Sequence, residues 1–231
     1  MRPNGIITLT TDFGLADSYV GTIKGVILGI APDARIIDIT HDISPQNTHQ
    51  AAYIVQTFPS YFPPGTIHMV IIDPTVGSDR RAIAFGTPEA IFVAPDNGVL
   101  TYVWRAALER WGPEACQVVE LAEPRFWLPR VSSTFHGRDI FAPVVAHLVR
   151  GATLDSLGHA CRGCWKLTWS SPPMGAPAAW LGALSTSIIL ATASPISRLS
   201  TWSSMGWASR SWCRLSTSVS PASAKPFPLW R

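Results

Sequence analysis

The sequence lacks several features that assign a chain to a familiar class. No apolar run approaches the roughly 20 residues that a helix needs to cross a bilayer. The first residues, MRPNGIITLTTDFG, contain neither the charged region nor the apolar region of a signal peptide, so we expect a cytoplasmic protein. Cys116, Cys161, Cys164 and Cys213 follow no disulfide framework. Because no second Cys pair or His pair accompanies Cys161 and Cys164, we expect no zinc site.

Acidic residues are absent from the last third of the chain. All 15 acidic residues of the 231 lie between Asp12 and Asp155, and residues 1–155 contain 11 basic ones, so residues 1–155 carry a net charge of −4. The remaining 76 residues contain seven basic residues and no acidic one, which makes the whole chain +3. A weakly acidic body gives no reason to expect nucleic acid as a partner. The basic end is too sparse and too rich in Ser for a phosphate-binding surface.

Strand-like and helix-like segments alternate through residue 150. The predicted strands are Ile6–Thr11, Ala34–Thr40, Ile67–Ile72, Ala82–Phe85, Ala90–Ala94 and Gln117–Leu121. The predicted helices are Ser18–Ile30, Gln46–Phe58, Leu100–Trp111 and Ile140–Arg150. A hydrophobic content of 47% is ample for a core. This alternation predicts an α/β fold, a mostly parallel sheet with helices on both faces, over residues 1–158.

Two local signals predict details of the first two helices. Gly21, Gly25 and Gly29 fall on one helix face, which suggests that this face packs closely on the sheet. Ser44 is a good N-cap, and Pro45 suits the first helical position after it.

Polar side chains stand where the predicted strands end. Asp12 follows the first strand, and Asp73 follows the buried run Ile67–Ile72, which Pro74 terminates. Arg80 comes seven residues after Asp73, across a turn, and Asp96-Asn97 closes a later strand. Ligands of open α/β sheets bind outside the carboxyl ends of the strands, so these residues predict a site. A surface ion pair that closes a hairpin is an equally open reading of Asp73 and Arg80.

Four motifs occur together in this order: TDFG at 11–14 with Asp17, DPxVG at 73–77 with Arg80, APDNG at 94–98, and TFHGRD at 134–139. In this order and spacing, over residues 5–158, the chain resembles the S-adenosyl-L-methionine (SAM) hydrolases that form adenosine. These are also called SAM hydroxide adenosyltransferases and are related to fluorinating and chlorinating enzymes. The resemblance implies an N-terminal α/β/α domain, a C-terminal β-barrel, a homotrimer, and SAM as a substrate that needs no cofactor.

The resemblance also implies roles for individual residues. Asp73, Arg80 and His136 match the family's water-handling residues. The implied substrate-binding residues are Asp12 at the ribose, Asp17, Ser18 and Tyr19 at the methionine end, and Phe135 and Gly137 near the adenosine. Simpler readings stay open, since His136 alone is an ordinary loop histidine, Asp12 a turn carboxylate and Asp17 a helix cap.

Two other enzyme readings are weaker. Halogenating relatives place Tyr and Thr where this chain has Asp73 and Val76, and Ser where it has Gly137. They also carry a long insertion at the short Thr87-Pro88 connection. A metal-dependent hydrolase using Asp12, Asp38 and Asp73 lacks a His at ligand spacing.

The composition changes from about Ser170. Seven of the ten Trp lie beyond residue 160, and the barrel motif of the family, HIDHFGNCITNI, is absent. Codons can be chosen for 185–197 that spell this motif when read from the third base. Our hypothesis is a frameshift between about 169 and 177, with 159–231 an aberrant Ser/Trp-rich tail in place of the barrel. A catalytically inactive fragment or a weak nucleoside-binding protein is therefore the alternative function.

Overall fold

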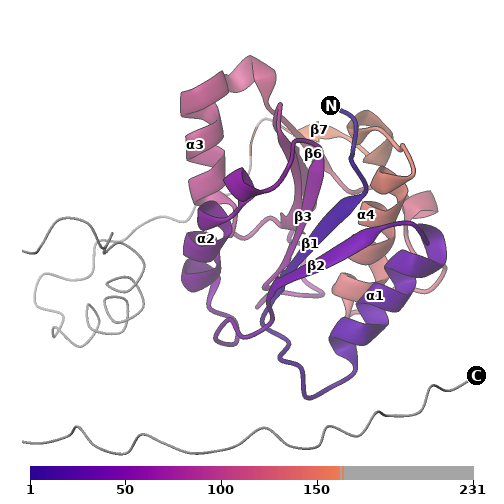
Figure 1. Ribbon diagram of the computed structural model, residues 1–231. Coiled ribbons are helices and arrows are strands. Elements are labelled where there is room, and N and C mark those ends of the chain that lie inside the picture. Colours follow the sequence, from indigo (N-terminus) through magenta and orange to yellow (C-terminus); the bar gives the residue numbers. More distant parts are fainter. Residues whose placement is uncertain (162, 164–231) are drawn as a thin grey trace, which may run out of the picture. The chain divides into compact units, whose positions relative to one another are not determined.

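A seven-stranded sheet with helices on both faces forms the part of the chain that the computed structural model describes, residues 1–161 and 163 (Figure 1). The strands are β1 Ile6–Thr11, β2 Arg35–Thr40, β3 Thr66–Ile71, β4 Ala82–Gly86, β5 Ala90–Pro95, β6 Gln117–Glu120 and β7 Ala160–Cys161. The α-helices are α1 Tyr19–Ile30, α2 Thr48–Thr57, α3 Thr101–Trp111 and α4 Ala142–Val149. Short helical turns occupy Pro59–Tyr61, Pro113–Ala115, Pro124–Phe126, Gly137–Phe141 and Leu154–Leu157.

The strand order is β2-β1-β3-β5-β4-β6-β7. The α/β fold class is confirmed, and β2, β1, β3 and β5 run parallel. The sheet is nevertheless mixed, because β4 pairs antiparallel with β5 and β6, and β6 pairs antiparallel with β7. The short Thr87-Pro88 connection accounts for the difference, since two strands joined by so few residues can only form a hairpin.

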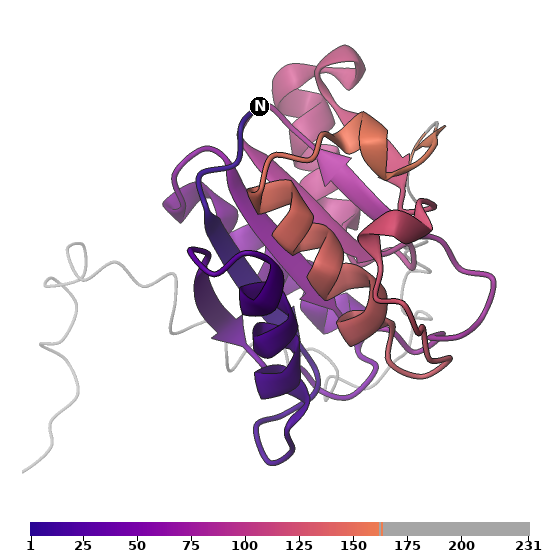
Figure 2. The ribbon, with the colours of Figure 1, turned by 90° about the vertical axis from the view of Figure 1, so that its right-hand side faces the viewer.

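Two apolar cores lie on opposite faces of the sheet. On one face α1 and α4 pack side by side, as Figure 2 shows, and Ile23, Ile27 and Val145 meet β1 and β3 there. On the other face α2 and α3 contribute Val55 and Val103 to the second core. Every residue of β1 and β3 is buried, as expected for central strands covered on both sides.

The glycine face of α1 does not pack on the sheet, so that expectation is wrong. Gly21, Gly25 and Gly29 are exposed, and a Cβ added to any of them would meet no atom within 4 Å. The opposite stripe of the helix, with Ile23 and Ile27, is buried instead. Burying large apolar side chains stabilises the fold more than close approach of glycines, so the isoleucines decide which face turns inward.

The start of α2 also differs from the prediction. Ser44 is not the N-cap. Asn47 caps the helix, and its Oδ1 accepts a hydrogen bond from the backbone N–H of Gln50 at 3.0 Å. Gln46 has a φ of +62°, a left-handed conformation that cannot continue a helix, so α2 begins only at Thr48.

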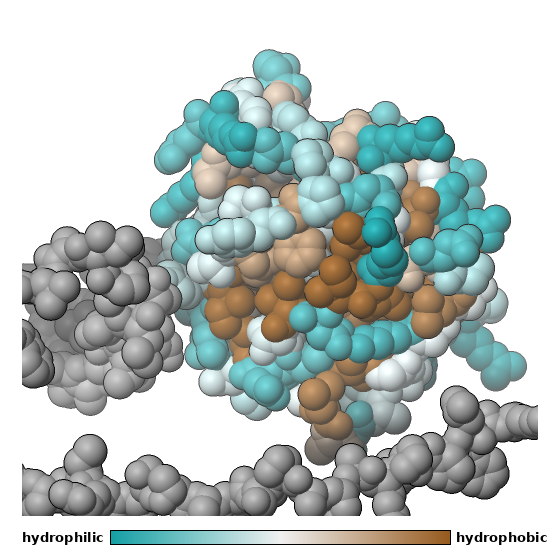
Figure 3. Space-filling model, viewed as in Figure 1, coloured by the Kyte–Doolittle hydropathy of each residue, from teal (hydrophilic) through white to brown (hydrophobic). Residues whose placement is uncertain are grey.

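The edge strand β2 is the least covered of the parallel strands. Its residues are half-buried or exposed, whereas those of β1, β3 and β5 are buried. Figure 3 shows apolar residues gathered across the face that carries this edge. Leu28 of α1 and Ile37 of β2 are among the exposed apolar side chains. Within the described residues no helix is long and apolar enough to cross a membrane.

The predicted tail, residues 159–231, lies outside the described residues except for 159–161 and 163. The interval 169–177 proposed for the frameshift, Cys164 and Cys213 lie outside them as well. The predicted domain boundary at residue 158 therefore stays a prediction.

Candidate active site

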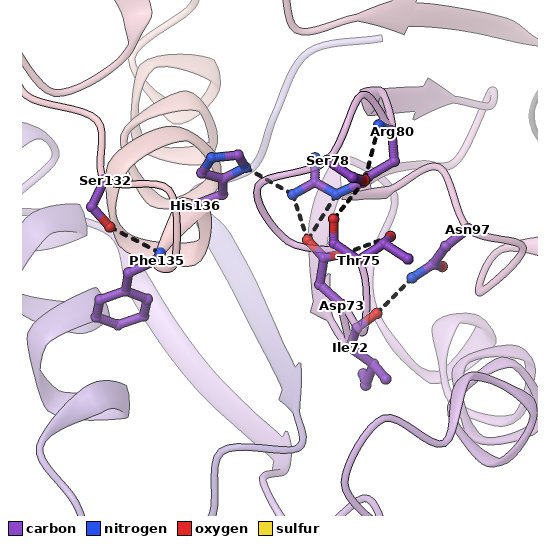
Figure 4. Close-up of polar contacts among 9 residues, drawn as sticks. All are labelled: Ile72, Asp73, Thr75, Ser78, Arg80, Asn97, Ser132, Phe135 and His136. Carbon is purple, nitrogen blue, oxygen red and sulfur yellow. Dashed lines mark hydrogen bonds and ion pairs between the residues drawn. The ribbon is translucent and has the colours of Figure 1, made fainter.

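Asp73 and Arg80 form a nearly buried ion pair beyond the carboxyl end of β3 (Figure 4). Nε of Arg80 donates to Oδ2 of Asp73 at 2.8 Å, and Nη2 of Arg80 donates to the same oxygen. The side chains of Arg80 and Asp73 are only 8% and 6% exposed. The reading of these residues as a surface ion pair is therefore wrong, because surface pairs remain open to water.

His136 joins this pair from a distant part of the sequence. Its Nδ1 lies 2.9 Å from Nη2 of Arg80, so one guanidinium contacts both Asp73 and His136. Burial lowers the pKa of His136, and the charge of Arg80 lowers it further, against a smaller opposite effect of Asp73 and Asp139. The three residues predicted to handle water thus meet in one cluster. His136 is not an ordinary loop histidine in this geometry.

The backbone around Asp73 is held by neighbouring loops. Nδ2 of Asn97 donates to the carbonyl of Ile72 at 2.8 Å, which fixes the end of β3. In the following turn Ser78 Oγ donates to the carbonyl of Thr75 at 2.7 Å, and Thr75 Oγ1 lies 3.4 Å from Oδ1 of Asp73. Figure 4 shows these contacts around the carboxylate. Since Oδ2 takes both bonds from Arg80, Oδ1 is the oxygen with capacity for a ligand.

His136 stands at the beginning of a wide, π-helical turn, Gly137–Phe141, that leads into α4. The helix was predicted to begin at Ile140, whereas the α-helix begins at Ala142 and the π turn precedes it directly. Pro143 has no N–H to donate to the carbonyl of Asp139 four residues before it. The N–H of Leu128 donates to that carbonyl instead, at 2.9 Å. A proline and a neighbouring segment thus stabilise the π turn, a conformation that is frequent at functional sites.

Asp139 ties the loop before His136 to the same turn. Its side chain is fully buried and accepts from the N–H of Ser132 at 2.8 Å and from Arg138 Nε at 2.6 Å. Burial alone would raise the pKa of Asp139, but these hydrogen bonds hold the pKa below its usual range. Oγ of Ser132 accepts from the N–H of Phe135 at 3.0 Å. Both ends of the loop are therefore fixed around His136.

Asp12 lies next to this cluster, at the end of the neighbouring strand. Thr11 of β1 pairs with Ile71 of β3, so Asp12 and Asp73 leave adjacent parallel strands at the same edge of the sheet. Oδ2 of Asp12 accepts from the backbone N–H of Gln46 at 2.7 Å. The expectation that the strand-end carboxylates share one rim is confirmed. Oδ1 of Asp12 is the oxygen that this contact leaves for another donor.

Three aromatic rings form a cluster beside Asp12. Phe135 packs edge-on against Phe13 at 5.9 Å and against Tyr19 at 5.2 Å between ring centroids. Gly137 contacts the same cluster, since a Cβ added there would lie 3.4 Å from Cζ of Phe13. Phe13 and Phe135 are half-buried and Tyr19 is exposed, so the cluster presents flat apolar surface at the rim of the site.

Asp17 and Ser18 stand at the beginning of α1, and both are exposed. Ser18 is the N-cap residue, yet its side chain makes no capping bond, and the first turn contains no acidic residue. The reading of Asp17 as the cap of this helix is therefore wrong. Both side chains project from the same segment as Tyr19, at the edge of the aromatic cluster.

The three carboxylates considered for a metal-dependent hydrolase do not gather. Asp12 binds a backbone N–H, Asp73 binds Arg80, and Asp38 has its oxygens 2.6 Å from Lys24 Nζ and 3.1 Å from His41 Nε2. No group of three or more His, Cys, Asp or Glu within residues 1–161 and 163 is arranged to hold a metal ion.

A cleft of about 480 Å³ opens beside Arg80. It is lined by Thr75, Asp79, Arg80, Arg81, Asp96 and Asn97. Arg81 Nε donates to Oδ2 of Asp96 at 2.9 Å in its wall. Arg80 thus lines this cleft, and its guanidinium contacts Asp73 and His136.

Asn97 was predicted at this edge of the sheet together with Asp96, and its hydrogen bond to the carbonyl of Ile72 agrees with that prediction. Sequence reasoning missed two other residues that hold this site. His41 and Gln46, which contact the segment around Asp12, carried no signal, because their contacts depend on the fold.

Comparison with known proteins places these residues in a family. Residues 7–158 match the family model described as the SAM hydroxide adenosyltransferase N-terminal domain. An (R)-S-adenosyl-L-methionine hydrolase from Salinispora arenicola is 44% identical over 155 residues, which cover 67% of this chain and 57% of that protein. A fluorinase from an Actinoplanes species is 27% identical over 180 residues, which cover 68% of this chain and 58% of that protein.

Among solved structures, an uncharacterised conserved protein from Thermotoga maritima aligns with a TM-score of 0.65 at 41% sequence identity. The alignment covers 70% of this chain and 61% of that one. The chain spans little more than half the length of the two curated relatives.

Proposed function

Because the chain belongs to the SAM hydroxide adenosyltransferase family, we propose that it hydrolyses S-adenosyl-L-methionine to adenosine and L-methionine. The observation that carries the proposal is the partly buried contact of Asp73, Arg80 and His136, which lies within the matched residues 7–158. A carboxylate and an imidazole that share one guanidinium are suited to orient a water molecule and to take its proton.

The proposed reaction needs little from a catalyst besides correct placement of the attacking water and the substrate. The oxygen of water forms a bond to C5′ of the ribose, and the bond between C5′ and the sulfonium sulfur breaks. The sulfur leaves as a neutral thioether, so no proton has to be delivered to the leaving group. The water releases one proton. A site that holds water in line with the C–S bond therefore supplies most of what this reaction needs.

Each of the three residues has a separate part in this proposal. Arg80 keeps Asp73 ionised and fixed, through two donors to one carboxylate oxygen. Oδ1 of Asp73 accepts a hydrogen bond from the attacking water and is the first acceptor of its proton. His136 orients the same water from its Nε2, because its Nδ1 already contacts Arg80.

The residues proposed to bind the substrate come from the same edge of the sheet. Asp12 has a free oxygen to accept from the ribose hydroxyls, beside the one that takes the Gln46 N–H. Phe135 offers the apolar surface against which the adenosine packs, and Gly137, which is buried beside Phe13, supports that surface. The remaining residues proposed for the methionine end are Asp17, Ser18 and Tyr19, at the start of α1.

The carboxylate of Asp73 supports hydrolysis over halogenation. A buried anion attracts the O–H of water and repels a halide, which is itself an anion. The direct β4–β5 hairpin leaves no room for the insertion that halogenating relatives carry there. Transfer of a halide to C5′ is therefore the weaker proposal.

The proposal also includes a homotrimeric, cytoplasmic protein, which the resemblance to the family supports. A second candidate is binding of adenosine without turnover. The limited coverage of the curated relatives favours this candidate, since about two-fifths of their length has no counterpart in the match.

The test is to incubate the purified chain with SAM in isotopically labelled water. We expect methionine, and adenosine that carries the labelled oxygen at its 5′ position. Adenosine without the label would contradict attack by water at C5′. Adenosine that binds the chain, measured by calorimetry, with no product from SAM would favour the second candidate.

A further inference from the structure

A buried histidine outside the proposed catalytic cluster contacts the strand end that bears Asp12. Nδ1 of His41 lies 2.8 Å from Oγ1 of Thr11, and both residues are buried. On its other side Nε2 of His41 lies 3.1 Å from Oδ1 of Asp38. Oδ2 of Asp38 in turn accepts from Lys24 Nζ at 2.6 Å. The imidazole thus connects the edge strand β2 to the residue directly before Asp12.

The protons in this series of contacts, from Lys24 through Asp38 and His41 to Thr11, have one consistent arrangement. Burial alone would raise the pKa of Asp38, but the hydrogen bond from Lys24 and the close contact with His41 outweigh it and lower that pKa. An ionised Asp38 favours a proton on Nε2 of His41, which leaves Nδ1 to accept from the hydroxyl of Thr11. The oxygen of Thr11 then keeps lone pairs for the N–H of Phe13, which lies 3.3 Å away.

The segment that contains His41 holds the residues around Asp12 at two further points. The N–H of Gly14 donates to the carbonyl of His41 at 2.8 Å, and the N–H of Gln46 donates to Oδ2 of Asp12 at 2.7 Å. Gln46 is the one described non-glycine residue with a positive φ, +62°. Such strained backbone persists where surrounding structure enforces it, and it occurs often at binding sites. Here it aims the N–H at the carboxylate.

We propose that His41 is a positioning residue, which fixes the carboxylate of Asp12 through Thr11 and through its own backbone carbonyl. The role for Asp12 as acceptor for the ribose hydroxyls rests on the proposed function. A preorganised carboxylate binds a diol more tightly, because the chain does not lose conformational entropy on binding. His41 therefore sets the affinity for the nucleoside without contacting it.

The fold supplies a matched control for this proposal. Thr8 of β1 and His68 of β3 form a second buried Thr–His pair, with the same 2.8 Å between Thr8 Oγ1 and His68 Nδ1. Thr8 lies in the middle of β1, away from the rim. Loss of its hydroxyl removes the same type of bond from the same strand and leaves the Asp12 segment in place.

The experiment compares Thr11→Val with Thr8→Val in the full chain, and Thr11→Ser serves as the rescue variant. Calorimetric titration with adenosine should show about fivefold weaker binding for Thr11→Val, in line with one lost hydrogen bond. Thr8→Val and Thr11→Ser should bind as the wild type does. Hydrogen exchange of the unliganded protein should quicken at residues 12–14 in Thr11→Val alone.

Each outcome of this experiment either supports or overturns the positioning role of His41. Equal weakening by Thr11→Val and Thr8→Val would reduce His41 to a structural role and overturn the inference. A wild-type chain that binds no adenosine would contradict the proposed function, and hydrogen exchange would then decide the positioning role by itself. Unchanged exchange at residues 12–14 in Thr11→Val would overturn it whatever the affinity.

Discussion

Nη2 of Arg80 lies 2.9 Å from Nδ1 of His136, across 56 residues of sequence. A guanidinium has donors and no acceptor, so Nδ1 of His136 must be the acceptor in this contact. The imidazole is therefore neutral, with its proton on Nε2. This arrangement leaves Asp73 as the base of the cluster and gives His136 the part of a donor.

The first prediction concerns pH. Burial and the charge of Arg80 lower the pKa of His136 below its ordinary value of 6.5. Its contribution to stability and to the ordered site is complete above pH 6.5 and is lost as the pH falls through the lowered pKa. We expect turnover of SAM to decrease on acidification with a midpoint below 6.5, measured as a pH–rate profile. Turnover that instead rises below pH 6.5 would mean that protonated His136 is the active form.

The second prediction concerns the geometry of Arg80. Lysine keeps the charge but cannot donate from two nitrogens to Asp73 while it contacts His136. We expect Arg80→Lys to lower turnover at least about tenfold, since a misplaced catalytic group loses its alignment with the substrate. Arg110→Lys is the control, because Arg110 pairs with Glu89 on the surface, where the two side chains are 59% and 40% exposed. Equal activity of the two variants would show that charge alone suffices.

The third prediction concerns the turn between Asp73 and Arg80. Gly77 has a φ of +81°, and a Cβ there would collide with the carbonyl oxygen of Ser133. Gly5 has a similar φ of +86° and nothing within 4 Å of an added Cβ. We expect Gly5→Ala to cost about 1–2 kcal/mol of unfolding free energy from backbone strain alone. Gly77→Ala should cost more and should also lower turnover.

Chemical denaturation of both variants provides the measurement. A Gly77→Ala variant as stable as Gly5→Ala would mean that the loop of Ser133 moves away at little cost. The site would then be less rigid than its contacts indicate.

The fourth prediction concerns His68, whose burial lowers its pKa to about 4. In the unfolded chain His68 takes up a proton near pH 6.5, whereas in the folded chain it does so only near pH 4. Its contribution to the unfolding free energy is therefore complete above pH 6.5 and is lost as the pH falls toward 4. At about 1.4 kcal/mol per pKa unit, the loss is about 3 kcal/mol. A Thr8→Val/His68→Phe double variant replaces both partners by apolar side chains of similar size. We expect its unfolding free energy to change with pH by about 3 kcal/mol less.

Denaturation at pH 7 and at pH 4 tests this difference. The new ring would join Phe58, Phe62 and Phe92, whose centroids surround His68 at 4.9 to 5.7 Å. A double variant that loses as much stability on acidification as the wild type would show that other groups dominate the acid response.

The strands and the ion pair at the end of β3 were predictable because their signals are local. A β-branched run that ends at Pro74 can only stop there, and Arg80 follows Asp73 closely enough for the turn to bring them together. The family motifs predicted His136 as a partner, although no local pattern places it 2.9 Å from Arg80.

Other features depended on the tertiary structure. In α1 both the large apolar residues and the glycines recur at helical spacing, so the sequence alone is compatible with either face on the sheet. The burial of Ile23 in place of the glycines decides which face turns inward. The late start of α2 follows from the left-handed Gln46, whose conformation is enforced by its bond to Asp12. Neither contact can be predicted from the local sequence.

The most direct test of the account is the rate at which the chain forms adenosine from SAM, compared between wild type and Asp73→Asn. Asparagine keeps the shape of the side chain and removes the base, so turnover should fall by about a hundredfold or more. Asp33→Asn, an exposed carboxylate between α1 and β2, should retain the wild-type rate. Equal adenosine formation by wild type and Asp73→Asn would contradict the central claim that the Asp73–Arg80–His136 cluster activates the water.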